Sequence, residues 1–154
     1  MIAARPPTAA IRPAVRDDLR AIAAIVDGAY RPYVARIGRE PGPMLDDYAA
    51  LVSAGRVHVL DQGGVRGFLV LLQEEDTMLL DNVAVHPDRQ SRGHGGLLMR
   101  FAEYMARAAG CVAIRLYAHE MMVENIARYR GFGYVETHRA EENGLRRVFM
   151  RKPL

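Results

Sequence analysis

The residue types best suited to chemistry gather in the glycine-rich segment Gln90-Ser91-Arg92-Gly93-His94-Gly95-Gly96. Its glycines allow the backbone to approach a ligand closely. Successive backbone amides at the start of a helix form a cradle for anions, because their N–H groups and the helix dipole are both positive there. Arg89 and Arg92 add positive charge at the rim. The segment predicts a binding turn for a phosphorylated ligand, although an ordinary strand-to-helix turn would have a similar composition.

Two common nucleotide-binding motifs do not fit this segment. The stretch from Gly93 to Leu98 lacks a third glycine at the spacing of a Rossmann turn. Lys152 is the only lysine of the chain, so no Walker lysine follows the glycines. Both classes of nucleotide site are therefore excluded.

A second candidate group is Tyr129, in the segment Ile126–Tyr134. A phenol with an ordinary pKa of about 10 can protonate a leaving group of similar basicity. The alternative is core packing, since Phe132 lies three residues later. Cys111 opens a predicted strand and is interpreted as a small buried side chain. As the only cysteine, it excludes an internal disulfide and cannot build a zinc site alone, and no metal site is predicted.

The periodicity of apolar residues indicates which elements position these groups. The order β-α-α-β-β-β-α-β-α-β-β predicts an α/β domain with a mixed sheet, spanning residues 1–154 with a flexible tail at 1–9. Pro13 suggests that the first strand lies at an edge. The predicted strands are Ala10–Val15, Val57–Leu60, Val65–Gln73, Met78–Val85, Val112–Tyr117, Tyr134–Ala140 and Arg146–Lys152. The predicted helices run from Asp17 to Tyr30, Met44 to Ala54, Gly95 to Ala109 and Val123 to Tyr129. Hairpin turns are expected at Gly63-Gly64 and Asn143-Gly144.

Composition limits the classes of partner. With 154 residues, half of them hydrophobic and a quarter charged, the chain can bury a core as one domain. The 21 Lys and Arg against 18 Asp and Glu give a net charge of only +3, and no run of cations is present, which argues against a nucleic-acid partner. No apolar run approaches the roughly 20 residues that cross a bilayer, and the first ten residues carry no secretion signal. Cytoplasmic localisation is expected.

The order of elements and two motifs resemble the GNAT superfamily of acetyl-CoA-dependent N-acetyltransferases. Leu80–Pro87, leading into Gln90–Gly95, is similar to the family's fourth strand and its Q/R-x-x-G-x-G/A pyrophosphate loop. Ile126–Tyr134 is similar to its A-x-x-Y-x-x-x-G-F helix, with the glycine shifted by one residue. The resemblance covers nearly the whole domain, and two motifs in the right order are far more specific than either alone.

The resemblance implies a co-substrate, acetyl-CoA, and a role for each matching residue. Tyr129 would protonate the departing thiolate, and a backbone amide of the fourth strand would polarise the thioester carbonyl, with no covalent enzyme intermediate. Strands four and five would splay apart to admit the thioester. The implied cofactor-binding residues are Val83, Ala84 and Val85, whose backbone would pair with the pantetheine arm, and Ser91, Arg92, Gly93, His94, Gly95 and Gly96, around the pyrophosphate.

One position departs from the family's pattern. The asparagine that many relatives place before the tyrosine corresponds to Met122. Asn125 lies on the same helical face as Met122 and Tyr129. It either takes over the cofactor contact or has only a capping or packing role.

The group that accepts the amine's proton is also open. Asp81 and Asn82 are adjacent on a predicted strand, so their side chains should point to opposite faces and only one should face the cleft. If that one is Asn82, ordered water, Glu120 or His119 would have to accept the proton, or the amine would arrive neutral.

The segment from Tyr30 to Met44 would cover the acceptor side in this fold. Tyr30, Tyr33, Arg36, Arg39 and Glu40 offer it aromatic and charged contacts. An acceptor with both an amine and a carboxylate would suit them, and a solvated surface is the alternative.

The sequence thus predicts an N-acetyltransferase that moves an acetyl group from acetyl-CoA to a primary amine by direct attack on the thioester. A small amine or amino-acid-like acceptor is favoured, with Tyr30, Tyr33, Asp81 and Asn82 as candidate contacts. An acyl-CoA-binding module without turnover, or a protein N-terminal or lysine acetyltransferase, are the alternatives. The closing hairpin leaves a sheet edge, which favours a symmetric homodimer, although its arginines also allow a monomer.

Overall fold

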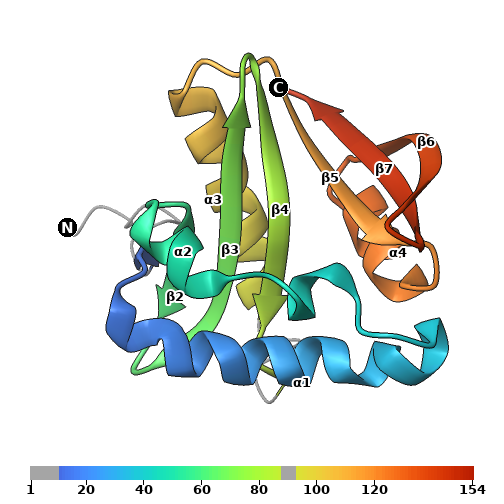
Figure 1. The fold of residues 1–154 in the computed structure, drawn as a ribbon. Coiled ribbons are helices and arrows are strands. Elements are labelled where there is room, and N and C mark those ends of the chain that lie inside the picture. The colour runs from blue at the N-terminus through green and yellow to red at the C-terminus, as the bar shows by residue number, and fades with distance from the viewer. Residues whose placement is uncertain (1–10, 88–92) are drawn as a thin grey trace.

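The computed structural model describes residues 11–87 and 93–154, so the predicted tail at 1–9 lies outside the described residues. In the described part seven strands form one sheet in the order β1-β2-β3-β4-β5-β7-β6 (Figure 1). Only β4 and β5 are parallel neighbours, which confirms the predicted α/β fold with a mixed sheet. The strands are β1 (Ile11–Pro13), β2 (Val57–Asp61), β3 (Val65–Glu74), β4 (Thr77–Val85), β5 (Ala113–His119), β6 (Val135–Glu142) and β7 (Leu145–Pro153).

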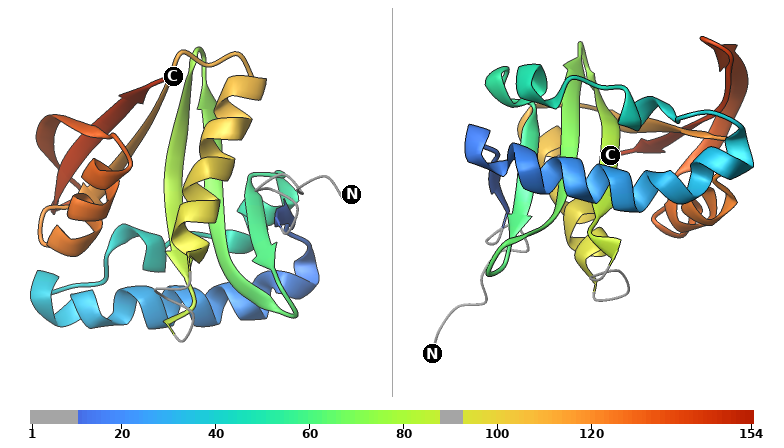
Figure 2. Two further views of the ribbon diagram at one scale, coloured as in Figure 1. Left: turned by 180° about the vertical axis from the view of Figure 1, so that it is seen from behind. Right: turned by 60° about the horizontal axis from the view of Figure 1, so that its bottom comes forward.

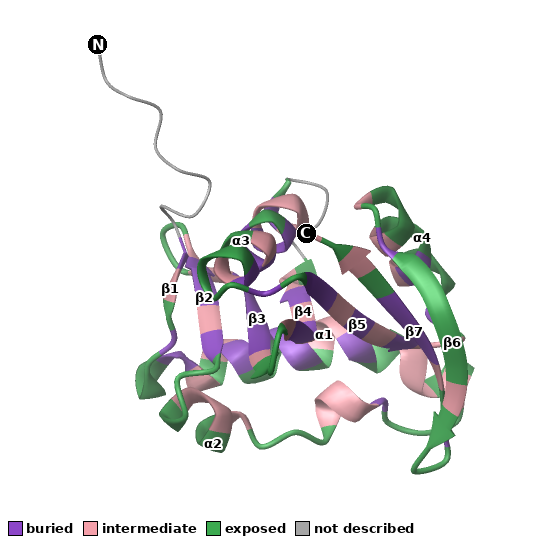
Figure 3. Cartoon of the chain, turned by 90° about the horizontal axis from the view of Figure 1, so that it is seen from above, coloured by how far each residue is buried: buried purple, intermediate pink, exposed green. Residues whose placement is uncertain are grey.

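One face of the sheet is covered by α1 (Leu19–Ile37) and α2 (Tyr48–Ser53). Ile22, Ile25 and Val26 recur at helical spacing and are buried against the sheet residues Phe68 and Val70. Burial of this stripe holds α1 across the strands, and buried and exposed residues alternate along the helix (Figure 3).

The opposite face is covered by α3 (His94–Ala108) and α4 (Val123–Gly131), which lie in front of the sheet in the rear view (Figure 2). Leu98, Phe101 and Ala102 of α3 pack in a core that includes Leu69 of β3 and Ile114 of β5. The sheet is therefore buried from both sides at its centre, as its nearly continuous apolar strands require. None of the described helices is both long and apolar enough to cross a membrane.

Turns and edges follow the predicted chemistry. Gly63 and Gly64 join β2 to β3, and Asn143 and Gly144 join β6 to β7, all four with positive φ. Two successive positive φ angles match the right-handed twist of a hairpin, and Asn and Gly adopt them at least cost. Pro13 lies in β1, an edge strand, as predicted, because the edge needs no N–H from it.

The parallel pair β4 and β5 is paired over only half its length. Thr77 to Leu80 lie opposite Ala113 to Leu116, and beyond them the two strands diverge (Figure 1). The predicted splay between these strands is thus present, at the end of β4 that leads toward α3.

Two predicted helix boundaries are wrong. The first helix continues through Pro32 to Ile37 instead of ending at Tyr30, because Tyr33 and Ile37 pack on the core and Arg36 pairs with a carboxylate on α4. The second begins at Tyr48 rather than Met44, since Asp47 caps it by accepting a hydrogen bond from the amide of Ala50 at 3.1 Å. A short 3-10 turn, η2 (Gly42–Met44), precedes it.

We expect Gly67→Ala to destabilise the fold, because Gly67 lies where β3 meets both β4 and α3. An added Cβ would lie 2.9 Å from the carbonyl oxygen of Ala84 and 3.0 Å from Leu98 Cδ1. The free energy of unfolding, measured in urea, should fall by about 1–3 kcal/mol. Gly131→Ala is the control, as no heavy atom lies within 4 Å of its added Cβ. An unchanged free energy in Gly67→Ala would contradict this packing.

Candidate active site

A cleft of about 830 Å³ lies between α1, the end of β4, the start of α3 and α4. This volume is within the range of sites that bind a large cofactor. We call it the donor cleft. Its wall includes Val83, Ala84 and Val85, to which the resemblance assigns a cofactor contact, together with Gly93, Gly95 and Gly96 at the start of α3 and Asn125, Arg128 and Tyr129 on α4.

The backbone of β4 is exposed to this cleft because β5 has turned away. The strand pairing with β5 stops at Leu80, so the edge of β4 beyond that residue has no strand beside it in the described structure. Unpaired N–H and C=O groups at such an edge can pair with an extended ligand as if with another strand. The segment Val83–Val85 therefore offers the kind of edge that was predicted for the pantetheine arm.

The start of α3 presents backbone amides to the same cleft. Gly93 has φ +80°, a left-handed conformation that glycine adopts without strain, and its carbonyl accepts the first helical hydrogen bond from Leu97 at 3.1 Å. The amides of residues 94 to 96 thus have no acceptor within the helix. A Cβ on Gly95 would meet only Val85 Cγ2, at 4.0 Å, so the space beside these amides is open to an anion.

Three predicted cofactor contacts of this segment need comment. Ser91 and Arg92 lie outside the described residues. His94 is described, and its side chain is 8% exposed and turned away from the cleft, with Nε2 3.1 Å from Gln62 Oε1 on the β2–β3 turn. The backbone amide of His94 still faces the start of the cleft, because it belongs to the first turn of α3. The predicted contact would therefore come from this amide and not from the imidazole ring.

A second, smaller cavity of about 40 Å³ adjoins the cleft. We call it the acceptor cavity. It shares Tyr30, Val83, Asn125 and Tyr129 with the donor cleft, so the two spaces meet at these four residues. The remaining wall is formed by Pro41, Gly42, Pro43, Leu80, Asp81, Asn82, Leu116, Tyr117, Ala118, His119, Met122, Leu145 and Arg147.

Tyr129 lies at the junction of the two spaces, near the end of α4. Its ring packs edge-on against Tyr134, with 6.3 Å between the ring centroids. Burial of the hydroxyl raises the pKa of Tyr129 to about 12, and the nearby phenol of Tyr33 adds to the shift. The phenol therefore keeps its proton at every working pH and can serve as a donor to either space.

Asp81 and Asn82 do not point to opposite faces, and that prediction is wrong. A β-bulge interrupts the pairing of β4 with β3, where Val70 lies opposite Asn82 and Leu71 opposite Leu80, and Asp81 is the extra residue. Leu80 and Val83 both face the core under α3. The bulge thus breaks the alternation, and Asp81 and Asn82 both line the acceptor cavity.

Asp81 is held by a tyrosine of the neighbouring strand. Tyr117 donates a hydrogen bond to Asp81 Oδ1 at 2.6 Å. Burial raises the pKa of Tyr117, and the hydrogen bond to Asp81 adds to the shift, so the phenol remains the donor. The guanidinium of Arg147 stacks over the Tyr117 ring at 4.5 Å and binds Glu142 at 2.7 Å. Asp81 is therefore fixed in place with one carboxylate oxygen, Oδ2, left for a ligand.

The two other predicted proton acceptors differ in position. His119 lines the acceptor cavity, and burial lowers its pKa, which favours the neutral imidazole. Its Nδ1 accepts a hydrogen bond from the Met121 amide at 3.1 Å, so the proton of the neutral ring is on Nε2. Glu120 lies outside the cavity wall, in ion pairs with Arg146 at 3.2 Å and Arg139 at 3.8 Å.

Asn125 lies in both walls, whereas Met122, buried at the start of α4, lines the acceptor cavity but not the donor cleft. The amide Nδ2 of Asn125 is 4.0 Å from Met122 Sδ, and its Oδ1 accepts a hydrogen bond from Arg128 at 3.3 Å. The side chain one turn before Tyr129 therefore reaches the position where a cofactor contact is possible.

The predicted acceptor segment lines the acceptor cavity through Tyr30 and Pro41–Pro43 and not through its arginines. Arg36, on α1, binds Glu124 Oε2 at 2.9 Å, and Arg39, which follows α1, binds the carbonyl of Asn143 at 2.9 Å. Tyr33 lines the donor cleft rather than the acceptor cavity. The residues that sequence reasoning missed are Tyr117 and Arg147, because nothing in their local pattern places them beside β4.

Comparison with known proteins supports this geometry. A family model described as "Acetyltransferase (GNAT) domain" matches residues 53–136, more than half of the chain. The chain belongs to the GNAT acetyltransferase family. In agreement, the protein is similar to a crystal structure from Rhodopseudomonas palustris described as "GCN5-Related N-acetyltransferase: Aminotransferase, Class-II", with 27% identity, a TM-score of 0.75 and coverage of 100% of this chain and 99% of that one.

Two further solved structures share the GNAT fold. The ribosomal-protein-S18-alanine N-acetyltransferase from Escherichia coli is 21% identical, with a TM-score of 0.74 and coverage of 93% of this chain and 92% of that one. PaiA N-acetyltransferase from Thermoplasma acidophilum, in complex with coenzyme A, is 16% identical, with a TM-score of 0.74 and coverage of 94% and 98%. Among curated protein sequences, none matches this GNAT chain.

We predict that Gly95→Val blocks the donor cleft without unfolding this GNAT protein. The added side chain would lie over amides that are free to bind an anion, while the nearest atom to its Cβ is 4.0 Å away. Loss of one hydrogen bond to a charged group costs about 1.5–3 kcal/mol, so acetyl-CoA affinity measured by calorimetry should fall by at least about tenfold. Ala108→Val, at the exposed far end of α3, controls for a β-branched residue in this helix. Equal affinities for both variants would contradict the placement.

Proposed function

We propose that this protein is an acetyl-CoA-dependent N-acetyltransferase that acts on the primary amine of a small molecule. The observation that carries the proposal is the meeting of a large donor cleft and a small acceptor cavity at Tyr129 and Val83. A transfer by direct attack needs donor and acceptor to approach one another at one point, with a proton donor there. Membership in the GNAT family supports this reading.

On the donor side, the pyrophosphate, the pantetheine arm and the thioester of acetyl-CoA each have a counterpart of suitable chemistry. The amides of residues 94 to 96 would bind the pyrophosphate, and the open edge of β4 at Val83–Val85 would pair with the pantetheine arm. The thioester would then enter the gap where β4 and β5 diverge, next to Tyr129. The presence of coenzyme A in the similarly folded PaiA structure is consistent with this cleft as its site.

The transfer forms one bond and breaks one. The amine nitrogen attacks the thioester carbonyl carbon, the C–N bond forms, and the C–S bond breaks with its electron pair on sulfur. A backbone N–H of β4 would stabilise the negative charge on the carbonyl oxygen. Tyr129 gives its proton to sulfur only as charge develops there, because a phenol with a pKa of about 12 does not dissociate beforehand. The proton that the nitrogen loses as the amide forms would then restore the phenol.

On the acceptor side, the geometry favours Asp81 as the group that binds the ammonium and accepts its proton. The carboxylate lines the cavity and is fixed by Tyr117, whereas the Nδ1 lone pair of His119 is engaged by the Met121 amide. Arg147 also lines this cavity, with its guanidinium over the Tyr117 ring and paired with Glu142, so the attraction for an ammonium group would come from the free oxygen of Asp81.

The size of the cavity favours a small acceptor. About 40 Å³ admits an aminomethyl group or a similarly small part of the molecule, and the Pro41–Pro43 segment closes the outer side. A bulky substituent next to the amine would not fit without movement of that segment.

Tyr129→Phe tests the proton donor and removes only one hydroxyl. We expect kcat for amine-dependent release of CoA to fall by about 10²–10⁴-fold, the usual contribution of general acid catalysis. The KM for acetyl-CoA should change little, because the hydroxyl acts mainly in the transition state. The assay detects the free thiol over a panel of amines. An acyl-CoA-binding module would instead bind acetyl-CoA without amine-dependent thiol release in the wild-type chain.

Asp81→Asn tests the proton acceptor and should change the pH dependence. The rate of the variant would depend on the fraction of the amine that is already neutral in solution. Its kcat/KM should therefore rise steadily as the pH approaches the amine's own pKa. At neutral pH the loss should be about 10²–10⁴-fold. Asp17→Asn, at an exposed site outside both cavities, is the matched control. A pH profile parallel to that of the wild type would refute the role of Asp81.

A further inference from the structure

A continuous series of hydrogen bonds crosses the fold beside the acceptor cavity. The Tyr30 hydroxyl, on α1, donates to Asn82 Oδ1 on β4. The amide Nδ2 of Asn82 donates to the Tyr48 hydroxyl at 2.8 Å, and Tyr48 donates to the carbonyl of Pro43 at 2.5 Å. Three separate elements and the Pro41–Pro43 segment are thereby connected through one asparagine.

This series can be satisfied in only one direction. Each hydroxyl has one proton, and the proton of Tyr48 is used by the Pro43 carbonyl, which cannot donate in return. Tyr48 must therefore accept from the asparagine, so the amide presents its NH₂ group to Tyr48 and its oxygen to Tyr30. Position 82 thus requires a side chain that donates on one side and accepts on the other.

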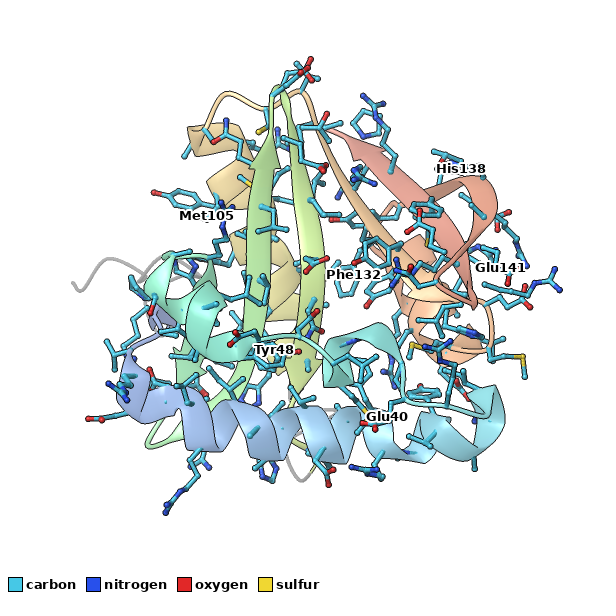
Figure 4. All side chains as sticks on the ribbon, viewed as in Figure 1. Glu40, Tyr48, Met105, Phe132, His138 and Glu141 are labelled. Atoms are coloured by element: carbon cyan, nitrogen blue, oxygen red, sulfur yellow. The ribbon has the colours of Figure 1, made fainter. Side chains whose placement is uncertain are left out.

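The network is buried at Tyr30 and Asn82 and half-buried at Tyr48 and Pro43. Tyr30 is 6% exposed and Asn82 is 4% exposed. The Tyr48 ring is fixed edge-on against Phe68, with 5.6 Å between the ring centroids, and it projects from the start of α2 toward the sheet (Figure 4). Buried polar groups that are fully paired hold one geometry, because any rearrangement would leave one of them without a partner.

The last acceptor of the series belongs to the wall of the acceptor cavity. Pro41, Gly42 and Pro43 all line that cavity, and two of them are prolines, which have no N–H for anchoring. Two hydrogen bonds close the 3-10 turn within the segment, from Met44 N to Pro41 O at 3.0 Å and from Leu45 N to Gly42 O at 2.9 Å. Met44 also packs on the core below α1. Among the hydrogen bonds of the described residues, the one on the Pro43 carbonyl is the one that connects the wall, through Tyr48 and Asn82, to the sheet.

We propose that Asn82 and Tyr48 are positioning residues that hold the Pro41–Pro43 segment as the outer wall of the acceptor cavity and thereby select small, unbranched primary amines. This inference rests on the proposed N-acetyltransferase function. It gives Asn82 a role different from direct contact with the acceptor, since its two polar ends are already used by Tyr30 and Tyr48.

Two substitutions release the wall by different chemistry. Tyr48→Phe removes the donor to Pro43 and keeps the ring on Phe68. Asn82→Asp keeps the shape of the side chain but removes its N–H donor. The carboxylate at position 82 would then draw the protons of both tyrosines, so that Tyr48 turns away from Pro43. Tyr104→Phe is the matched control, because Tyr104 is an exposed residue of α3 outside both cavities.

The kinetic test uses the full chain and a series of primary amines from ethylamine to cyclohexylmethylamine. In both variants the KM for small amines should rise on the order of tenfold, because the free energy of about one hydrogen bond no longer holds the cavity wall in place. The KM for acetyl-CoA should stay the same, and the relative kcat/KM for branched amines should increase. The double variant should be no worse than either single variant, because both break the same attachment. Equal changes in both KM values, or unchanged selectivity among the amines, would overturn the proposal.

Hydrogen exchange followed by mass spectrometry gives a readout that does not depend on turnover. Peptides covering residues 41–48 should exchange faster in Tyr48→Phe and in Asn82→Asp, and at the wild-type rate in Tyr104→Phe. Unchanged exchange in this segment overturns the proposal whatever the activity. Failure of the proposed function is distinct from this, as it would show as an absence of CoA release from the wild-type chain with every amine.

Discussion

The bulge at Asp81 is the constraint on which the rest of the site depends. One extra residue in β4 lets Leu80 remain in the core under α3, and it also ends the pairing with β5 at Leu116. A strand that twists away from its neighbour exposes its own edge, and here the exposed edge is the wall of the donor cleft.

The same bulge brings two polar side chains to one face. Asp81 is directed to Tyr117 on one side, and Asn82 to Tyr30 and Tyr48 on the other. The carboxylate of Asp81 and the buried amide of Asn82 are therefore adjacent in the sequence but have different partners. The carboxylate keeps one oxygen available for a ligand, whereas both ends of the amide are used within the protein.

The long helix α1 connects the two halves of the molecule. Its first half packs on β2 and β3, and its last turns reach α4, where Arg36 binds Glu124 and Tyr33 donates a hydrogen bond to the same carboxylate at 3.4 Å. These contacts are exposed and contribute modestly to stability. Their effect is geometric, because they keep α4, and with it Tyr129, beside the divergent end of β4.

The sequence by itself determined the order of elements, the hairpin turns and the two motif segments, since apolar periodicity, paired turn residues and the glycines after β4 are local signals. It did not determine that α1 passes Pro32, that Asp81 and Asn82 share a face, or that His94 turns toward Gln62. Each of these depends on partners far along the chain, and local propensity is overridden where such partners bury apolar area or satisfy a polar group. Only the tertiary structure decided that Tyr48 and Pro43 lie beside Asn82, because 34 residues separate Tyr48 from Asn82 and the hydrogen bonds that join them exist only in the folded chain.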